Sequence, residues 1–277
     1  MSATPFHWYA AHAAVAVVIA FAVMIAIEKL RSWRAARDLD AASSVASFVS
    51  AAAFLIVKTL AGKALFLALA LWIYSNHRVF TLDMWNPLVW IVVFVVRDFV
   101  YYRVHRLEHR VRVLWASHMI HHSPETIGAT TSIRLPWIEA LYKPWFSLWL
   151  PLIGFDPLLA VAFDAFAATI SLSQHTARRT KTTVLDKVFV TAATHRVHHG
   201  SNPEYIDKNF GAIFIVWDRL FGTYEPEVAP VVYGLIGSSA ISTPTEALVG
   251  GYPKLFKAAA TKGSIPNQFR FLVGAPG

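Results

Sequence analysis

Residues 194–200 read THRVHHG and contain three histidines in the spacing HxxHH. Residues 118–122 read HMIHH and repeat that spacing. On a helix, residues three and four apart lie on one face, so each motif is expected to point three imidazoles into one small volume. Imidazole is a common ligand of iron, zinc, copper and nickel near neutral pH. The two motifs therefore predict a metal centre.

Other histidines cluster near the two motifs. His105 and His109 precede the first motif at helical spacing, and Asp98 and Tyr102 fall on the same helical stripe. His175 precedes the second motif. The candidate metal ligands are His105, His109, His118, His121, His122, His175, His195, His198 and His199. They exceed the three or four protein ligands that one zinc ion takes, which indicates two ions with open positions.

The composition is that of an integral membrane protein. Of the 277 residues, 56% are hydrophobic and 15% are charged, whereas soluble domains average about 45–50% and about 25%. With no cysteine in the chain, disulfides, cysteine-ligated zinc and iron–sulfur clusters are excluded. The net charge of +8 suits anionic lipid headgroups, and no nucleic-acid-binding motif is present.

Apolar runs divide the chain into candidate membrane helices. They cover residues 10–27, 50–75 and 85–104, followed by two shorter runs at 138–152 and 157–173. Basic residues after the first run place that end in the cytoplasm by the positive-inside rule, and counting crossings then brings both HxxHH motifs to the cytoplasmic side. We expect an all-α integral membrane protein with about 4–5 spanning or membrane-dipping helices and a cytoplasmic-side, histidine-rich helical cap, forming one domain over residues 1–277.

Three segments resemble the fatty acid hydroxylase/sterol desaturase superfamily of membrane di-iron oxygenases. They are residues 97–109 (RDFVYYRVHRLEH), 115–123 (WASHMIHHS) and 195–200 (HRVHHG). The continuation of the third segment to residue 227 is most similar to the alkylglycerol-monooxygenase-like branch. The resemblance covers roughly residues 84–255, and the chain departs from the family pattern at Arg110 and Ser171.

The resemblance implies an enzyme that hydroxylates or desaturates a C–H bond of a lipid. The nine histidines would hold two iron ions, and O2 would be the oxidant. Electrons would come from an external donor, either a redox partner protein or a reduced pterin. The substrate would be a fatty acyl chain, a sterol or other isoprenoid, or an ether lipid, entering from the bilayer.

Four polar side chains are candidates to orient the ligands: Asp98, Asp207, Asn209 and Asp218. A salt bridge is the alternative role of Asp98, and a turn is the alternative for the segment that holds Asp207 and Asn209. Tyr101, Tyr102, Trp115 and Trp137 are candidates to line the substrate path, with anchoring at the membrane interface as the alternative.

Two other functions compete with the oxygenase. A zinc-dependent membrane lipid hydrolase or isomerase would also use histidine ligands, although the metalloprotease motif HExxH is absent. A metal transporter or sensor is the non-enzymatic alternative. Transport would place polar residues along several spans, whereas these histidines gather at one end.

Overall fold

The computed structural model describes Val23, Ile27 and residues 41–176, 183–237 and 241–276. Within these residues the regular structure is helical, and the only β pairing is an isolated bridge between Phe189 and Phe214. The predicted all-α class is therefore confirmed. The first predicted span, residues 10–27, lies outside the described residues apart from Val23 and Ile27.

A long helical segment opens the described chain. It consists of α2 (Ala41–Val57), the π-helical η1 (Lys58–Leu67) and α3 (Ala68–His77). Residues Ala42–His77 are long and apolar enough to cross a membrane. The first turns bury Ala46 and Ser50 against the protein, whereas Leu60 and Trp72 further along are exposed. The span predicted at residues 50–75 lies within this segment.

The helices α4 (Pro87–Arg110) and α9 (Pro157–Gln174) pack against each other, with the rings of Phe94 and Phe163 5.3 Å apart. Each begins in the same way. Asn86 and Asp156 accept the N–H two residues ahead, and a proline occupies the first turn, where no N–H is needed.

Helix α9 is the second described helix that is apolar enough to cross a membrane, and α4 does not meet that criterion. The span predicted at residues 85–104 falls on α4, where Arg97, Asp98 and Arg103 interrupt the apolar run. The described residues thus support two spans of the four or five expected.

Residues 138–152 were expected to form one short helix, and this prediction is wrong. They form α7 (Glu139–Tyr142), the 3-10 helix η2 (Lys143–Ser147) and most of α8 (Trp149–Ile153). Pro144 lies in the 3-10 turn between the two α-helices, where its missing N–H cannot support a continuous helix. Gly154 ends α8 with φ 126°, and a Cβ there would lie 2.1 Å from the Phe80 carbonyl oxygen.

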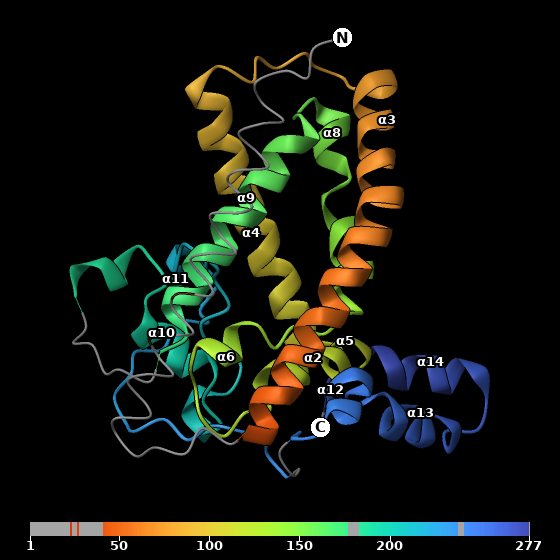
Figure 1. Cartoon of the computed structure of the whole chain (residues 1–277), viewed down its shortest axis with the longest axis vertical. Helices are drawn as coiled ribbons and strands as arrows, with labels where there is room; N and C mark the ends of the chain where they lie inside the picture. The colour runs from red at the N-terminus through yellow and green to blue at the C-terminus, as the bar shows by residue number, and fades with distance from the viewer. Residues whose placement is uncertain (1–22, 24–26, 28–40, 177–182, 238–240, 277) are drawn as a thin grey trace.

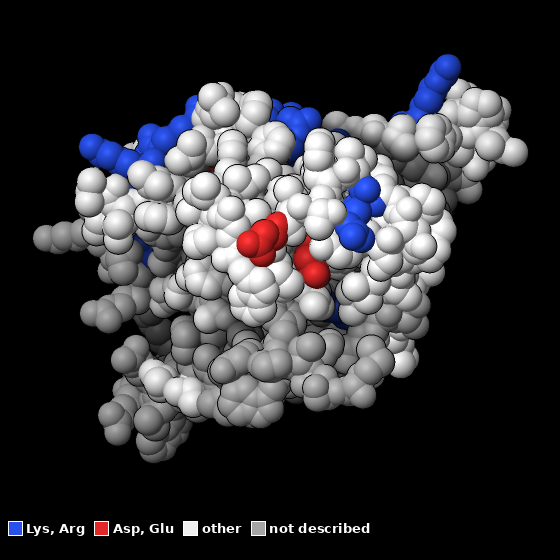
Figure 2. All heavy atoms as spheres, turned by 90° about the horizontal axis from the view of Figure 1, so that it is seen from above, with Lys and Arg blue, Asp and Glu red and all other residues white. Residues whose placement is uncertain are grey.

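The remaining helices form a cap at one end of the long helices (Figure 1). These are α5 (Arg112–His122), α6 (Ala129–Ser132), η3 (Val184–Lys187), α10 (Ala192–His198), η4 (Pro203–Tyr205), α11 (Val216–Leu220), α12 (Pro244–Val249), α13 (Tyr252–Ala260) and α14 (Ile265–Val273). Seen from the opposite end, the described surface is mostly uncharged, with a few acidic side chains near its centre and basic side chains beside them and along one edge (Figure 2). The histidine motifs lie in the cap.

Candidate metal centre

Three helices and one helix end carry the histidines. The last turns of α4 hold His105 and His109, and the extended Val111 turns the chain directly into α5 with the first motif. The second motif lies on α10, whose start is fixed by the Thr191 side chain accepting from the Thr194 N–H. His175 caps the end of α9.

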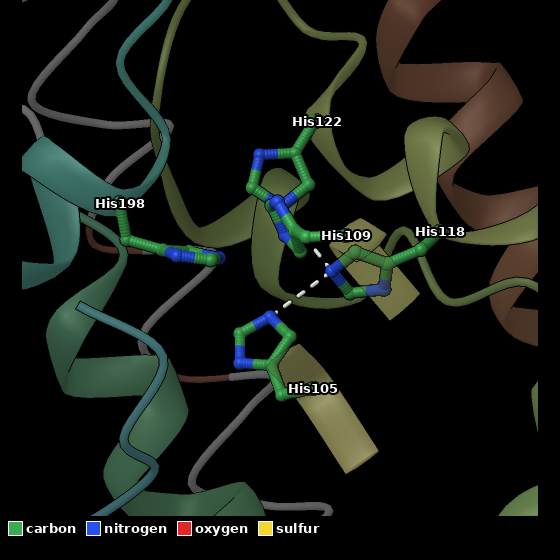
Figure 3. Close-up of side chains that lie close together, drawn as sticks. All are labelled: His105, His109, His118, His122 and His198. Atoms are coloured by element: carbon green, nitrogen blue, oxygen red, sulfur yellow. Dashed lines mark hydrogen bonds between the residues drawn. The ribbon is translucent and has the colours of Figure 1, made fainter. Parts of the chain in front are cut away.

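The structure brings the nine predicted histidines into two adjoining groups. In each group every residue offers one ring nitrogen, and these nitrogens lie within 4.8 Å of one another. The first group, drawn in Figure 3, is His105, His109, His118, His122 and His198. The second group is His121, His175, His195 and His199. The groups are in contact, because the His122 and His199 rings stack with centroids 4.5 Å apart.

Each HxxHH motif is divided between the two groups. His118 and His122 enter the first group and His121 the second; His195 and His199 enter the second and His198 the first. Residues four apart share a face of a helix most closely. The remaining histidine of each motif, His121 or His198, points to the neighbouring group. The expectation that each motif fills one volume is thus wrong in detail, because the spacing serves two adjacent volumes.

Backbone carbonyls determine which nitrogen carries the proton in several of the histidine rings. Four of the nine place Nδ1 beside a carbonyl oxygen: His105 with Phe210 (2.8 Å), His121 with Arg134 (3.3 Å), His175 with Ser171 (2.7 Å) and His198 with Lys208 (3.0 Å). A carbonyl oxygen only accepts, so Nδ1 carries the proton. Nε2 of each neutral ring is then left with a bare lone pair.

These bare nitrogens face one another. Nε2 of His121 lies 3.3 Å from Nε2 of His175, and both rings donate from Nδ1. Nε2 of His105 likewise lies 3.0 Å from Nε2 of His118. Among the described residues, the buried Nε2 atoms of His109 and His198 have no hydrogen-bond partner. Lone pairs held this close repel unless a cation lies between them.

The rings do not relieve this repulsion by taking up a proton near neutral pH. Burial lowers the pKa of His105, His118, His121, His122, His195, His198 and His199 well below the usual histidine value, and that of His175 to about 4. With metal–nitrogen bonds of about 2.1 Å, neighbouring ligand nitrogens lie about 3.0 Å apart at a right angle and about 3.4 Å apart at the tetrahedral angle. The observed separations of 3.0 and 3.3 Å match those of nitrogens around a metal ion.

A buried carboxylate pair supports the first group. Nδ1 of His118 lies 2.9 Å from Glu139 Oε1 and 3.6 Å from Glu108 Oε2. The Lys143 ammonium lies 2.6 Å from Glu139 and 3.1 Å from Glu108, and Tyr142 donates to Glu108. Burial raises the pKa of Glu108 to about 8, against the lowering effect of Lys143. The sequence interpretation missed these residues, although Glu108 stands directly before His109.

The loop with sequence DKNFG supplies carbonyls to His198 of the second motif and to His105 of α4. Asp207 and Asn209 adopt the left-handed conformation, with φ of 59° and 57°, which aspartate and asparagine tolerate better than most residues. This local geometry positions the carbonyls of Lys208 and Phe210. The turn foreseen for this segment is therefore formed, and its function at the site is carried by its backbone.

Three of the four predicted orienting residues act on backbone groups instead of on imidazoles. Asp218 accepts from the N–H groups of Phe210 and Gly211, at 2.7 and 2.8 Å. Asn209 donates to the Thr194 and Glu225 carbonyls. Asp98 accepts from the Ile213 and Phe214 N–H groups and from the Trp217 indole. Asp218 and Asn209 hold the loop whose carbonyls orient the rings. Asp98 holds the segment that follows this loop, and the salt bridge considered for it is not its role.

Asp207 is the one predicted orienting residue beside an imidazole. Its carboxylate lies 3.6 Å from Nδ1 of His109, which is beyond hydrogen-bonding distance. It pairs more closely with Arg110, at 2.9 Å. Arg110, one of the two departures from the family pattern, thus holds the carboxylate that faces His109.

The four aromatic candidates differ in position. The Trp115 ring lies 5.1 Å from His109, and Tyr101 lies 5.5 Å from His105. Tyr102 is fully buried and bonds Thr223, so it belongs to the packing between α4 and the cap. Trp137 donates to the Leu248 carbonyl at 2.9 Å and lines an apolar groove beside α13.

Comparisons with known proteins agree with these features. The sequence profile of the fatty acid hydroxylase family matches residues 90–223. The chain is 32% identical over 215 residues to an alkylglycerol monooxygenase of Xenopus tropicalis, covering 78% of this chain and 48% of the relative. The human alkylglycerol monooxygenase is 34% identical over 211 residues, covering 75% and 46%.

A bacterial lipid hydroxylase is also similar. The ornithine lipid hydroxylase of Rhizobium tropici is 31% identical over 176 residues, covering 60% of this chain and 51% of the relative. The chain thus spans about half the length of the curated relatives that it matches. No solved structure matches it.

Proposed function

The chain belongs to the fatty acid hydroxylase family through residues 90–223, and we propose that it is a membrane-embedded two-metal oxygenase that hydroxylates the hydrocarbon part of a lipid. The observation that carries this proposal is the division of nine neutral imidazoles, eight of them buried, into adjoining groups of five and four. Relatives named alkylglycerol monooxygenase and ornithine lipid hydroxylase favour hydroxylation over desaturation.

In this proposal all nine histidines are metal ligands and the two metals are iron. Bound there, the metal pair would supply activation of O2. A set of imidazoles without carboxylate ligands leaves the bound metals positively charged, which favours oxygen-derived anions. Glu139 would increase the basicity of His118, and the carbonyls of Phe210 and Lys208 would hold two further rings in orientation.

Hydroxylation of a C–H bond by O2 consumes two electrons and two protons and releases water. The chain contains no cysteine, so an iron–sulfur centre within it cannot supply the electrons. We propose an external donor, either a redox protein or a reduced pterin, and an active site on the cytoplasmic side where such donors are available.

The test is to express the chain with a redox system or a reduced pterin and to supply isotopically heavy O2. Membrane lipids are compared with those from cells expressing the His121→Ala variant. We expect a lipid product heavier by one oxygen atom, with that atom derived from O2 and the product absent from the variant. Turnover without oxygen, or a product whose new oxygen comes from water, contradicts the proposal and favours a hydrolase.

A further inference from the structure

The last two described helices expose an apolar stripe. On α14, Ile265, Phe269 and Val273 are 81%, 63% and 44% exposed. They are four residues apart and therefore share one side of the helix. On α13, Leu255 and Ala259 face the protein and are buried, whereas Phe256 is 54% exposed. Large exposed apolar side chains in a row indicate a surface that is covered in the working protein.

All charged side chains of the segment that holds α13 and α14 are basic. Residues 250–276 contain Lys254, Lys257, Lys262 and Arg270, all exposed, and neither aspartate nor glutamate. Short helices that combine an apolar side with basic residues are typical of proteins that lie in a lipid headgroup layer, where the cations contact anionic lipids.

The position of α13 and α14 fits a membrane interface. Figure 1 shows them extending sideways from the cap, across the direction of α3. They follow α12, which packs against α2, at the start of the described membrane-crossing segment. A helix that lies at the end of a span and across its direction runs along the bilayer surface.

The inner sides of the two helices are fixed to the protein. Gly251 donates to the Ala116 carbonyl at 2.7 Å, and Arg112 N–H donates to Gly274 at 2.8 Å. The Arg112 guanidinium also lies 4.1 Å from the centre of the Phe271 ring. These contacts hold α14 on α5, so the exposed stripe has a defined direction.

An apolar groove of about 310 Å³ opens beside α13, and its walls include Trp137, Val249 and Phe256. The groove continues the apolar surface of α13 towards α12 and α5. Acyl chains of a bilayer would fill it without leaving a polar group unpaired, because the walls carry almost no polar surface.

We propose that α13 and α14 lie in the headgroup layer of an anionic bilayer leaflet. Ile265, Phe269 and Val273 insert among the acyl chains, and the four basic side chains contact lipid phosphates. This anchor would hold the cap, and with it the histidine groups, at a fixed distance from the membrane surface. The inference does not depend on the reaction that the metal centre catalyses.

The absence of native cysteines allows a direct test by site-specific labelling. The full chain with Phe269→Cys carries a fluorophore and is placed in nanodiscs of phosphatidylcholine with anionic phosphatidylglycerol. The matched control is Asn267→Cys, which is also exposed on α14 but lies on its other side, because two residues turn a helix by about 200°. Ile265→Cys repeats the measurement without changing Phe269.

We expect the label at position 269 to be quenched by lipids with a spin label on the acyl chain. The same label should be protected from quenching by aqueous iodide. The label at position 267 should show the reverse. Replacing Lys254, Lys257 and Arg270 with glutamine should reduce the lipid quenching at position 269. Full iodide quenching at positions 265 and 269 overturns the proposal. Protection from iodide without lipid quenching also overturns it, since a second copy or a protein partner then covers the stripe.

Discussion

Replacing His198 with alanine is expected to abolish lipid hydroxylation. His198 lies in the five-histidine group, and its buried Nε2 atom has no hydrogen-bond partner among the described residues. If it is a ligand, the variant leaves a ligand position that no neighbouring side chain fills. Since substitution of residues that merely support ligands costs 10–100-fold in metal affinity or activity, loss of a ligand should cost at least about 100-fold in product formation.

The same assay separates a ligand from a structural histidine. His77 is exposed at the end of α3, where its ring contacts Trp72. The His77→Ala variant should form product at the wild-type rate. Helical circular dichroism and gel filtration in detergent should be unchanged in both variants. A His198→Ala protein that hydroxylates lipid normally would contradict its assignment as a ligand.

Replacing Glu139 with alanine is expected to weaken the metal centre without removing a ligand. Glu139 accepts from His118 and pairs with Lys143, and it is only 2% exposed. Its loss leaves the His118 imidazole N–H and the partly exposed Lys143 ammonium without this partner. We expect metal affinity to fall by about 10–100-fold. The free energy of unfolding should fall by less than the about 3–5 kcal/mol of a fully buried ion pair, because the Lys143 side chain is 28% exposed and keeps Glu108 at 3.1 Å.

The conservative variant distinguishes the two effects. Glu139→Gln keeps an oxygen that accepts from His118 but removes the charge that pairs with Lys143. Metal affinity, measured by competition with a chelator, should recover in part, while the stability measured by thermal unfolding should remain low. Glu125→Ala, at an exposed glutamate, should change neither. Equal chelator competition in Glu139→Ala and the wild type would show that this carboxylate does not support the site.

The sequence was sufficient where side-chain identity and helical spacing carry the information. The nine histidines, the all-α class and the common stripe of Asp98, Tyr102, His105 and His109 follow from residue types at i, i+4 and i+7. The structure places this stripe in the interior, where Asp98 and Tyr102 are fully buried. Periodicity indicates which residues share a face, but not which atoms they meet.

The sequence-based predictions failed where backbone carbonyls contact the histidines and where segments distant in sequence come together. The acceptors for His105 and His198 are the carbonyls of Phe210 and Lys208, which any residue could supply. Glu139 was missed because its contact with His118 depends on the break of the helix predicted at residues 138–152. The division of each HxxHH motif between two groups requires both motifs to be seen together.

The central claim is that the nine histidines hold two iron ions, and metal analysis of the purified protein tests it most directly. The protein is extracted in mild detergent without chelators, and its metals and protein are quantified on the same sample. The account predicts about two irons per chain, as the groups of five and four require. It also predicts about one for a variant in which His195 and His199 are both replaced. Zinc without iron, or iron that is unchanged in that variant, would contradict the account.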